Sequence, residues 1–333
     1  MNRHQRPQLS PAFWLLAATL SCHESCEKRP GASDGGVTSA PAQSSSASSA
    51  ASAKPAAKKD DSVNLILPAA SVSAFQNPSG VPVYTGPTGS VEGTITVDGD
   101  PDPDLGLDFS KCPAARDTYA KLFREGAPLP NGTRPLADAL VGVTGYAGFY
   151  VPGKSDVRKV TIDKCAFSER TIDMTIGERL EVYNATTILY APVLAQVTTP
   201  AIMLAPPHGD PVKLYPPKPA YYTLLDRVNG AKYMTANVYV LAYPLHATSD
   251  LDGHYRIDGI PVGTMDVSAR LAAIQKTAST KVDIKEHVVA RVDLTLTYHK
   301  PANGAPPAAA GDAAAPVNNS PVAAPAAGER GAC

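Results

Sequence analysis

Residues 236–267 constrain the fold of this chain more than any other part of the sequence. Valines at alternate positions, Val238 and Val240, lead to an Asp-Leu-Asp-Gly turn at 250–253. A short alternating segment follows at 255–257, and then an Ile-Pro-Val-Gly turn at 260–263. Apolar residues at every second position, bounded by Asp/Gly and Pro/Gly turns, are typical of antiparallel strands.

The same kind of signal recurs along the chain. Strand-forming segments occur at 91–97, 139–144, 159–162, 171–176, 179–183, 221–225, 236–240, 255–257, 265–271, 280–284 and 288–296. Gly177 and Glu178 form a hairpin-like break between two of them, and 114–123 is the one helical candidate. Many short strands separated by turns predict an all-β protein built from two small β-sandwiches.

The N-terminus has the features of an export signal. Arg3 and Arg6 precede an apolar run at 13–20, which is too short to span a bilayer. The run ends at Ser21-Cys22, a small residue followed by a thiol. We therefore expect a signal peptide at 1–21 and a lipid on Cys22, whose several acyl chains would hold the protein at a membrane. Cleavage without lipid, or an uncleaved anchor, is the alternative.

Two segments have the composition of disordered chain. Residues 22–85 are rich in Ser, Ala and Pro, and 300–333 are rich in Pro and Ala. Such segments bury too little apolar surface to offset the entropy of ordering, so we expect a flexible tether and a flexible tail. The net charge of −1 gives no reason to expect nucleic acid as a partner.

The cysteines divide by position. Cys22 is the expected lipid acceptor, Cys26 lies in the tether, and Cys333 ends the tail. Export implies an oxidising compartment, in which thiols pair. Cys112 and Cys165 are the thiols left in the folded region, and we expect them to form a disulfide, with two separate buried thiols as the alternative.

Two segments resemble known families. The pattern D-x-D-G-x-Y-x-I-x-x-I-P-x-G at 250–263 resembles the carboxypeptidase regulatory-like β-sandwich, a small transthyretin-like module. Residues 155–245, with the strand Ile-Gly-Glu-Arg-Leu-Glu-Val-Tyr-Asn at 176–184, resemble a cupredoxin-like (plastocyanin-like) domain of bacterial secreted proteins. The resemblance implies N-terminal β strands at 86–154, a cupredoxin-like domain at 155–245 and regulatory-like strands at 246–299.

The order of these units stays open. Gly93-x-Ile95-x-Val97-x-Gly99 also resembles the first strand and turn of a regulatory-like module. Either the cupredoxin-like unit interrupts that module, or the two units follow one another in tandem.

The cupredoxin resemblance implies a type 1 copper site, which needs two imidazoles, a thiolate and a weak axial thioether. The corresponding positions here are Tyr190, Val228, Ala231 and Met234, of which only Met234 matches. No cysteine lies between Cys165 and Cys333. We therefore expect no metal and no cofactor, and we expect these four side chains to form a dry apolar cluster at one end of the sandwich.

Several Asp, His and Tyr side chains could serve either the fold, as turn and packing residues, or the binding of a metal or another ligand. Five carboxylates lie close together in sequence and would serve as turn residues or Ca²⁺ ligands: Asp98, Asp100, Asp102, Asp104 and Asp108. Asp250 begins either a hairpin turn or an incomplete calcium loop. His246 and His254 flank that turn, either as edge histidines or as a metal pair. Four tyrosines near a Pro-rich connection pack in the core or form a rim for a glycan or peptide: Tyr215, Tyr221, Tyr222 and Tyr233.

These features favour a non-enzymatic exported lipoprotein that faces the periplasm or cell surface. No Ser/His/Asp set, nucleophile elbow or phosphate-binding loop is evident. The copper-less cupredoxin-like scaffold would serve as a binding or structural module at the cell envelope. The lipid anchor would attach it to the membrane, and its binding partner would be an envelope protein or a glycan. The alternative is a metal-handling or electron-transfer protein with non-standard ligands.

Overall fold

Strands dominate the part of the chain that the structure describes. The structure, a computed structural model, covers residues 66–197 and 202–301. Within these ranges it contains strands β1 to β17 and four short helical segments, which confirms the predicted all-β fold. The predicted signal peptide, Cys22, Cys26 and the tail beyond residue 301 lie outside the described residues.

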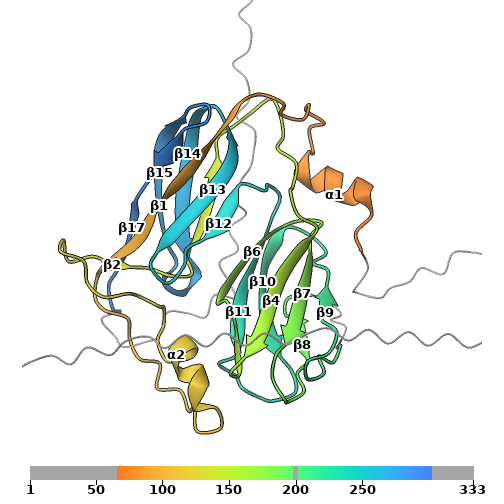
Figure 1. The fold of residues 1–333 in the computed structure, drawn as a ribbon, viewed down its shortest axis with the longest axis vertical. Helices are drawn as coiled ribbons and strands as arrows, with labels where there is room; N and C mark the ends of the chain where they lie inside the picture. The colour runs from red at the N-terminus through yellow and green to blue at the C-terminus, as the bar shows by residue number, and fades with distance from the viewer. Residues whose placement is uncertain (1–65, 198–201, 302–333) are drawn as a thin grey trace, which may run out of the picture. The chain divides into compact units, whose positions relative to one another are not determined.

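One pair of sheets encloses the first core (Figure 1). One sheet has the order β13-β1-β16, with β17 and β2 also paired to β1, and the other has the order β12-β3-β14-β15. The strands are β1 (Thr88–Gly99), β2 (Arg134–Pro135), β3 (Leu140–Thr144), β12 (His246–Thr248), β13 (His254–Pro261), β14 (Gly263–Leu271), β15 (Lys276–Ile284), β16 (Val289–Arg291) and β17 (Leu294–Tyr298). Val91, Val141 and Val267 are fully buried between the sheets, as period-two alternation requires. We call this unit the outer sandwich.

A second pair of sheets encloses a separate core (Figure 1). Their orders are β6-β11-β10-β8 and β5-β4-β7-β9. The strands are β4 (Val157–Asp163), β5 (Ala166–Phe167), β6 (Thr171–Thr175), β7 (Arg179–Asn184), β8 (Pro192–Leu194), β9 (Val212–Leu214), β10 (Ala220–Asp226) and β11 (Thr235–Leu241). Ile172, Val182 and Val238 are fully buried there. We call this unit the inner sandwich.

The inner sandwich interrupts the outer one. β1 pairs antiparallel with β13, from Thr88 opposite Pro261 to Thr94 opposite His254. β3 pairs with both β12 and β14. All strands from β4 to β11 lie between these partners in sequence, so the strand pairing has the interrupted order and not the tandem one.

Two glycines of the predicted motifs allow close backbone approaches. A Cβ on Gly93 would collide with the backbone carbonyl of Val292, and a Cβ on Gly253 would collide with that of Ile95. Gly253 also has a φ of +77°, which side chains disfavour. Both motif glycines therefore lie where segments distant in sequence meet β1.

The break at Gly177 and Glu178 is not a hairpin. β6 pairs with β11, whereas β7 pairs with β4 and β9 in the opposite sheet. The chain crosses from one sheet to the other here, with Gly177 at a φ of +101°. Alternation predicts both strands correctly but carries no information about which sheet each one joins.

The predicted tether contains an ordered helix. α1 (Ala69–Gln76) lies against the β6–β7 turn, where Gln76 Nε2 donates to the carbonyl of Ile176 at 2.8 Å. Val72 packs on Gly177. The expectation that disorder extends to residue 85 is therefore wrong for this segment.

The helical candidate at 114–123 is shorter than predicted, as η1 (Pro113–Ala115) and α2 (Arg116–Tyr119). No helix among the described residues is long and apolar enough to span a membrane.

The predicted Cys112–Cys165 disulfide is present. It joins the residue before η1 to the turn between β4 and β5, across a sequence separation of 53. A cross-link over a loop of this length reduces the entropy of the unfolded chain.

We expect Cys112→Ser to lower the free energy of unfolding by about 3 to 5 kcal/mol, because the open chain regains loop entropy. Denaturant titration at pH 7 would measure the change, with Cys333→Ser as a control that leaves it unaltered. Non-reducing peptide mapping that finds both thiols free in the exported protein would contradict the assignment.

Candidate functional site

The four copper-position residues lie at one end of the inner sandwich but do not form the expected dry cluster. Tyr190 and Met234 are each 1% exposed and belong to the core, and Ala231 packs partly buried against it. Val228 is 50% exposed. The expectation is thus wrong for Val228.

Asp226 explains why Val228 faces solvent. The buried Asp226 carboxylate accepts hydrogen bonds from the backbone N–H of Ala191 and of Asn229, each at 2.8 Å. The side chain of Asn229 donates to the same carboxylate and to the carbonyl of Leu189. These bonds fix the turn at 226–229 against the segment before β8, with Val228 at its exposed tip.

The Tyr190 ring fills the position where the resemblance places an imidazole. Burial raises the pKa of Tyr190, and the nearby Thr186 hydroxyl lowers it in part. The Tyr190 hydroxyl makes no hydrogen bond with good geometry to any described residue. The Thr186 hydroxyl instead donates to Asn184 Oδ1 at 2.8 Å. The residues at this end are consistent with core packing and do not fit a copper ligand set.

Three of the five aspartates at 98–108 act as turn residues. They accept backbone N–H groups one or two residues ahead: Asp98 from Gly99, Asp104 from Gly106 and Asp108 from Ser110. Asp102 forms an ion pair with Lys121 at 2.9 Å. Among residues 66–197 and 202–301, no group of three or more His, Cys, Asp or Glu side chains is placed to hold a metal ion.

The tyrosines near the Pro-rich connection pack and form no exposed rim. Tyr222 is 1% exposed, and the other three are only partly accessible. The Tyr221 ring contacts that of Tyr239 at 5.3 Å, and the Tyr233 ring contacts that of Phe109 at 4.8 Å.

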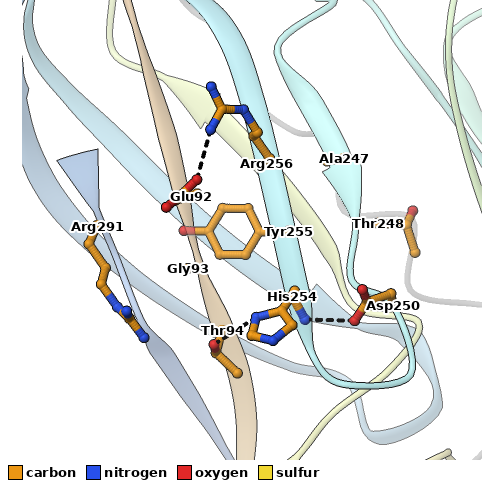
Figure 2. A pocket seen from close by; sticks show the side chains of 10 residues that line it. All are labelled: Glu92, Gly93, Thr94, Ala247, Thr248, Asp250, His254, Tyr255, Arg256 and Arg291. Carbon is orange, nitrogen blue, oxygen red and sulfur yellow. Dashed lines mark hydrogen bonds and ion pairs between the residues drawn. The ribbon is translucent and has the colours of Figure 1, made fainter. Parts of the chain in front are cut away.

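The turn at 250–253 is not the predicted hairpin turn, because β12 before it pairs with β3, whereas β13 after it pairs with β1 in the other sheet. Asp250 Oδ1 accepts from the backbone N–H of Asp252 at 2.9 Å and of His254 at 2.8 Å. Beside this turn is an open pocket of about 530 Å³, with a lining that includes residues of β1, β12 and β13. Figure 2 shows the residues that line it. In the pocket, His254 Nδ1 lies 3.2 Å from the Thr94 hydroxyl, and Arg256 forms an ion pair with Glu92 at 2.8 Å.

His246 has a different environment from His254, so the two do not act as a metal pair. His246 Nδ1 lies 2.7 Å from Asp173 Oδ2, and His246 Nε2 lies 3.0 Å from the Thr175 hydroxyl. Asp173 and Thr175 belong to β6 of the inner sandwich, whereas His246 begins β12 of the outer one. This polar network is the feature of the site that the sequence analysis did not find.

Further bonds complete the network. Arg158 on β4 reaches Asp173 Oδ1 at 3.1 Å and Glu169 at 2.6 Å. The Thr248 hydroxyl also donates to Asp173 Oδ1, at 3.1 Å. Burial by itself would raise the pKa of Asp173, but the hydrogen bond and charge of His246, with Arg158 and Thr248, outweigh it and lower that pKa to about 2.

The order of groups, carboxylate to imidazole to hydroxyl, is that of a hydrolytic relay. Its geometry favours a structural role instead, because Thr175 is 3% exposed and a substrate carbonyl has no approach to a buried hydroxyl. Asp173 and His246 are 73 residues apart. No spacing rule connects them, so only the fold brings them together.

Comparisons with known proteins add little to this geometry. No protein-family model matches the sequence, and no curated protein does either. Among solved structures, part of the chain is similar to the reduced form of a point mutant of amicyanin, with 16% identity over 26% of this chain and 84% of that one, at a TM-score of 0.23.

Two further structures are similar at the same level. Amicyanin from Paracoccus versutus shares 13% identity over 26% of this chain and 83% of its own, at a TM-score of 0.23. A copper-containing nitrite reductase from Thermus scotoductus SA-01 shares 18% identity over 29% of this chain and 25% of its own, at 0.22. At such TM-scores these similarities support no argument about this chain.

We expect Asp173→Asn to lower the free energy of unfolding at pH 7 by about 2 to 4 kcal/mol, because it leaves Arg158 and His246 without their shared carboxylate. The folded-state pKa of Asp173 is below its usual 3.8. Its stabilisation is therefore present above about pH 4 and is lost as the pH falls towards 2. Denaturant unfolding between pH 2 and pH 7 should show the difference from wild type shrinking in acid.

The matched control is Asp283→Asn on the exposed strand β15, which we expect to change stability little. A difference between wild type and Asp173→Asn that stays constant down to pH 2 would contradict the assigned role of the carboxylate.

Proposed function

We propose that this chain is a non-enzymatic exported lipoprotein whose two sandwiches form a copper-less scaffold at the cell envelope, with the inner sandwich cupredoxin-like and the outer one regulatory-like. The chain would be anchored through Cys22 and would face the periplasm or cell surface. Its role would be structural, or the binding of an envelope protein or a glycan.

One observation supports this proposal above the others. The most elaborate polar network among the described residues, around Asp173 and His246, connects β6 with β12 and offers no accessible hydroxyl to a substrate. Charged groups of this kind are used for positioning when their partners are all internal to the fold. A scaffold needs such fixed geometry, whereas a hydrolase needs the hydroxyl open to its substrate.

Packing at the copper positions supports the same proposal. A redox site needs ligands with free lone pairs around an open coordination volume. Here Tyr190 and Met234 occupy that volume as core side chains. The proposal therefore assigns no electron-transfer role to the inner sandwich.

The anchor is tested by Cys22→Ala. We expect this variant to leave the membrane fraction or to stay unprocessed, because the acceptor thiol for the lipid is gone. Cys26→Ala, four residues along, is the matched control and should remain lipidated. A Cys22→Ala protein that is processed and membrane-bound like wild type would refute the anchor.

The absence of a metal role is tested by elemental analysis of the purified exported protein. We expect no stoichiometric copper or zinc after dialysis against a chelator. Stoichiometric metal that survives chelation would favour the alternative, a metal-handling or electron-transfer protein with non-standard ligands.

A further inference from the structure

Large apolar side chains are exposed at the end of the inner sandwich that carries Tyr190. Ile188 is 44% exposed, Leu189 37%, Leu204 55% and Val228 50%. They lie on three loops, at 185–189, 202–209 and 227–232. We call these four residues the apolar tip.

Hydrogen bonds hold the three loops together. Tyr190 and Ala205 form an antiparallel bridge, and Asn184 Nδ2 donates to the carbonyls of Ile188 and Ala205, each at 2.8 Å. Asn229 Nδ2 donates to the carbonyl of Leu189 at 2.9 Å. The exposed side chains are therefore presented by a braced end of the sandwich.

The charge on the three loops themselves has one sign. The three loops contain no Asp or Glu, whereas the third contains the cations Arg227 and Lys232, both exposed. The nearest acid, Asp226, is buried and its carboxylate is fully engaged by the turn. Exposed carboxylates flank the loops. They are Asp210, Asp163 beside Lys164 on the β4–β5 turn, and Asp108, whose neighbour Phe109 packs on Tyr233.

We propose that the apolar tip inserts into the interfacial region of an anionic lipid bilayer, with Arg227 and Lys232 at the headgroups. Exposed Ile, Leu and Val beside Lys and Arg favour such a surface over water, through apolar burial and attraction to anionic lipid. A protein partner would need acidic groups of its own around an apolar contact, whereas anionic bilayers offer both properties together.

This contact is separate from the proposed anchor on Cys22. The anchor would hold the chain near the membrane through its N-terminus, and the tip would hold the inner sandwich itself against the lipid. The experiment therefore needs a local probe at the tip, which reports insertion whether or not the N-terminus binds.

Tryptophan supplies that probe, because Trp14 is the one tryptophan of the chain. In the full chain with Trp14→Phe, Leu189→Trp places the probe at the tip, and Leu251→Trp places a control probe on the exposed turn of the outer sandwich, where Leu251 is 62% exposed. Vesicles of phosphatidylethanolamine and phosphatidylglycerol that carry brominated acyl chains quench an inserted indole.

We expect strong quenching of the probe at position 189 and little at position 251. Arg227→Glu with Lys232→Glu should weaken binding of the tip to the anionic vesicles about 25-fold or more, since each cation near such a surface contributes about fivefold. Vesicles of phosphatidylcholine alone should quench less.

Two results would overturn the proposal. One is a vesicle-bound chain in which the probe at 189 is not quenched, or is quenched no more than the control, and this result leaves the Cys22 anchor standing. The other is self-association or capture of a protein that Leu189→Asp abolishes, with no quenching by lipid. A Cys22→Ala protein that is processed and membrane-bound like wild type, with quenching at 189 retained, would refute the anchor alone.

Discussion

The pairing of β1 with β13 is the interaction on which the rest of the fold depends. It joins residues near 90 to residues near 260, and all eight strands of the inner sandwich lie between them. Loop-closure entropy grows slowly with loop length, by about 0.6 kcal/mol for each doubling, so a whole domain is tolerated within such a closure. The insert must nevertheless bring its own ends together. The bond from the Ile176 backbone N–H to the carbonyl of Leu241, at 2.8 Å, fixes the exit strand β11 beside β6.

Two kinds of contact then link the sandwiches. An apolar cluster combines Leu140 of β3 with Tyr239 and Leu241 of β11 and with Ala272. Beside it, Asp173 of β6 binds His246 and Thr248 of β12. Apolar contacts tolerate small slips, whereas a shared carboxylate with fixed partners specifies one arrangement. The lowered pKa of Asp173 is the electrostatic signature of that arrangement.

At the end of the inner sandwich, two residues that the resemblance assigns to the same copper site differ in burial. Tyr190 turns inward and fills the core, while Val228, held out by the Asp226 turn, faces solvent. Both side chains are largely apolar, so the sequence pattern predicts burial for both. Burial is decided by the backbone bonds around each residue, which is why the expected dry cluster became a packed core with an exposed apolar tip above it.

The sequence by itself determined the longer strands, because period-two alternation and Asp/Gly or Pro/Gly turns are local signals, but it gave no signal for the short strands β2, β5, β8, β9 and β12. It also predicted the Cys112–Cys165 disulfide, by elimination among five cysteines. It left open whether the sandwiches are interrupted or in tandem, predicted hairpins at Gly177 and at 250–253 where the chain instead passes from one sheet to the other, and extended the tether over α1. The order of the sandwiches and the nature of these turns depend on which strands pair, and strand pairing is a tertiary property. The Asp173–His246–Thr175 network had no sequence signal, since its members approach only when β6 of one sandwich lies against β12 of the other. Local sequence signals therefore determine where strands form. Long-range pairing determines which strands are neighbours, and with that which residues form the candidate site.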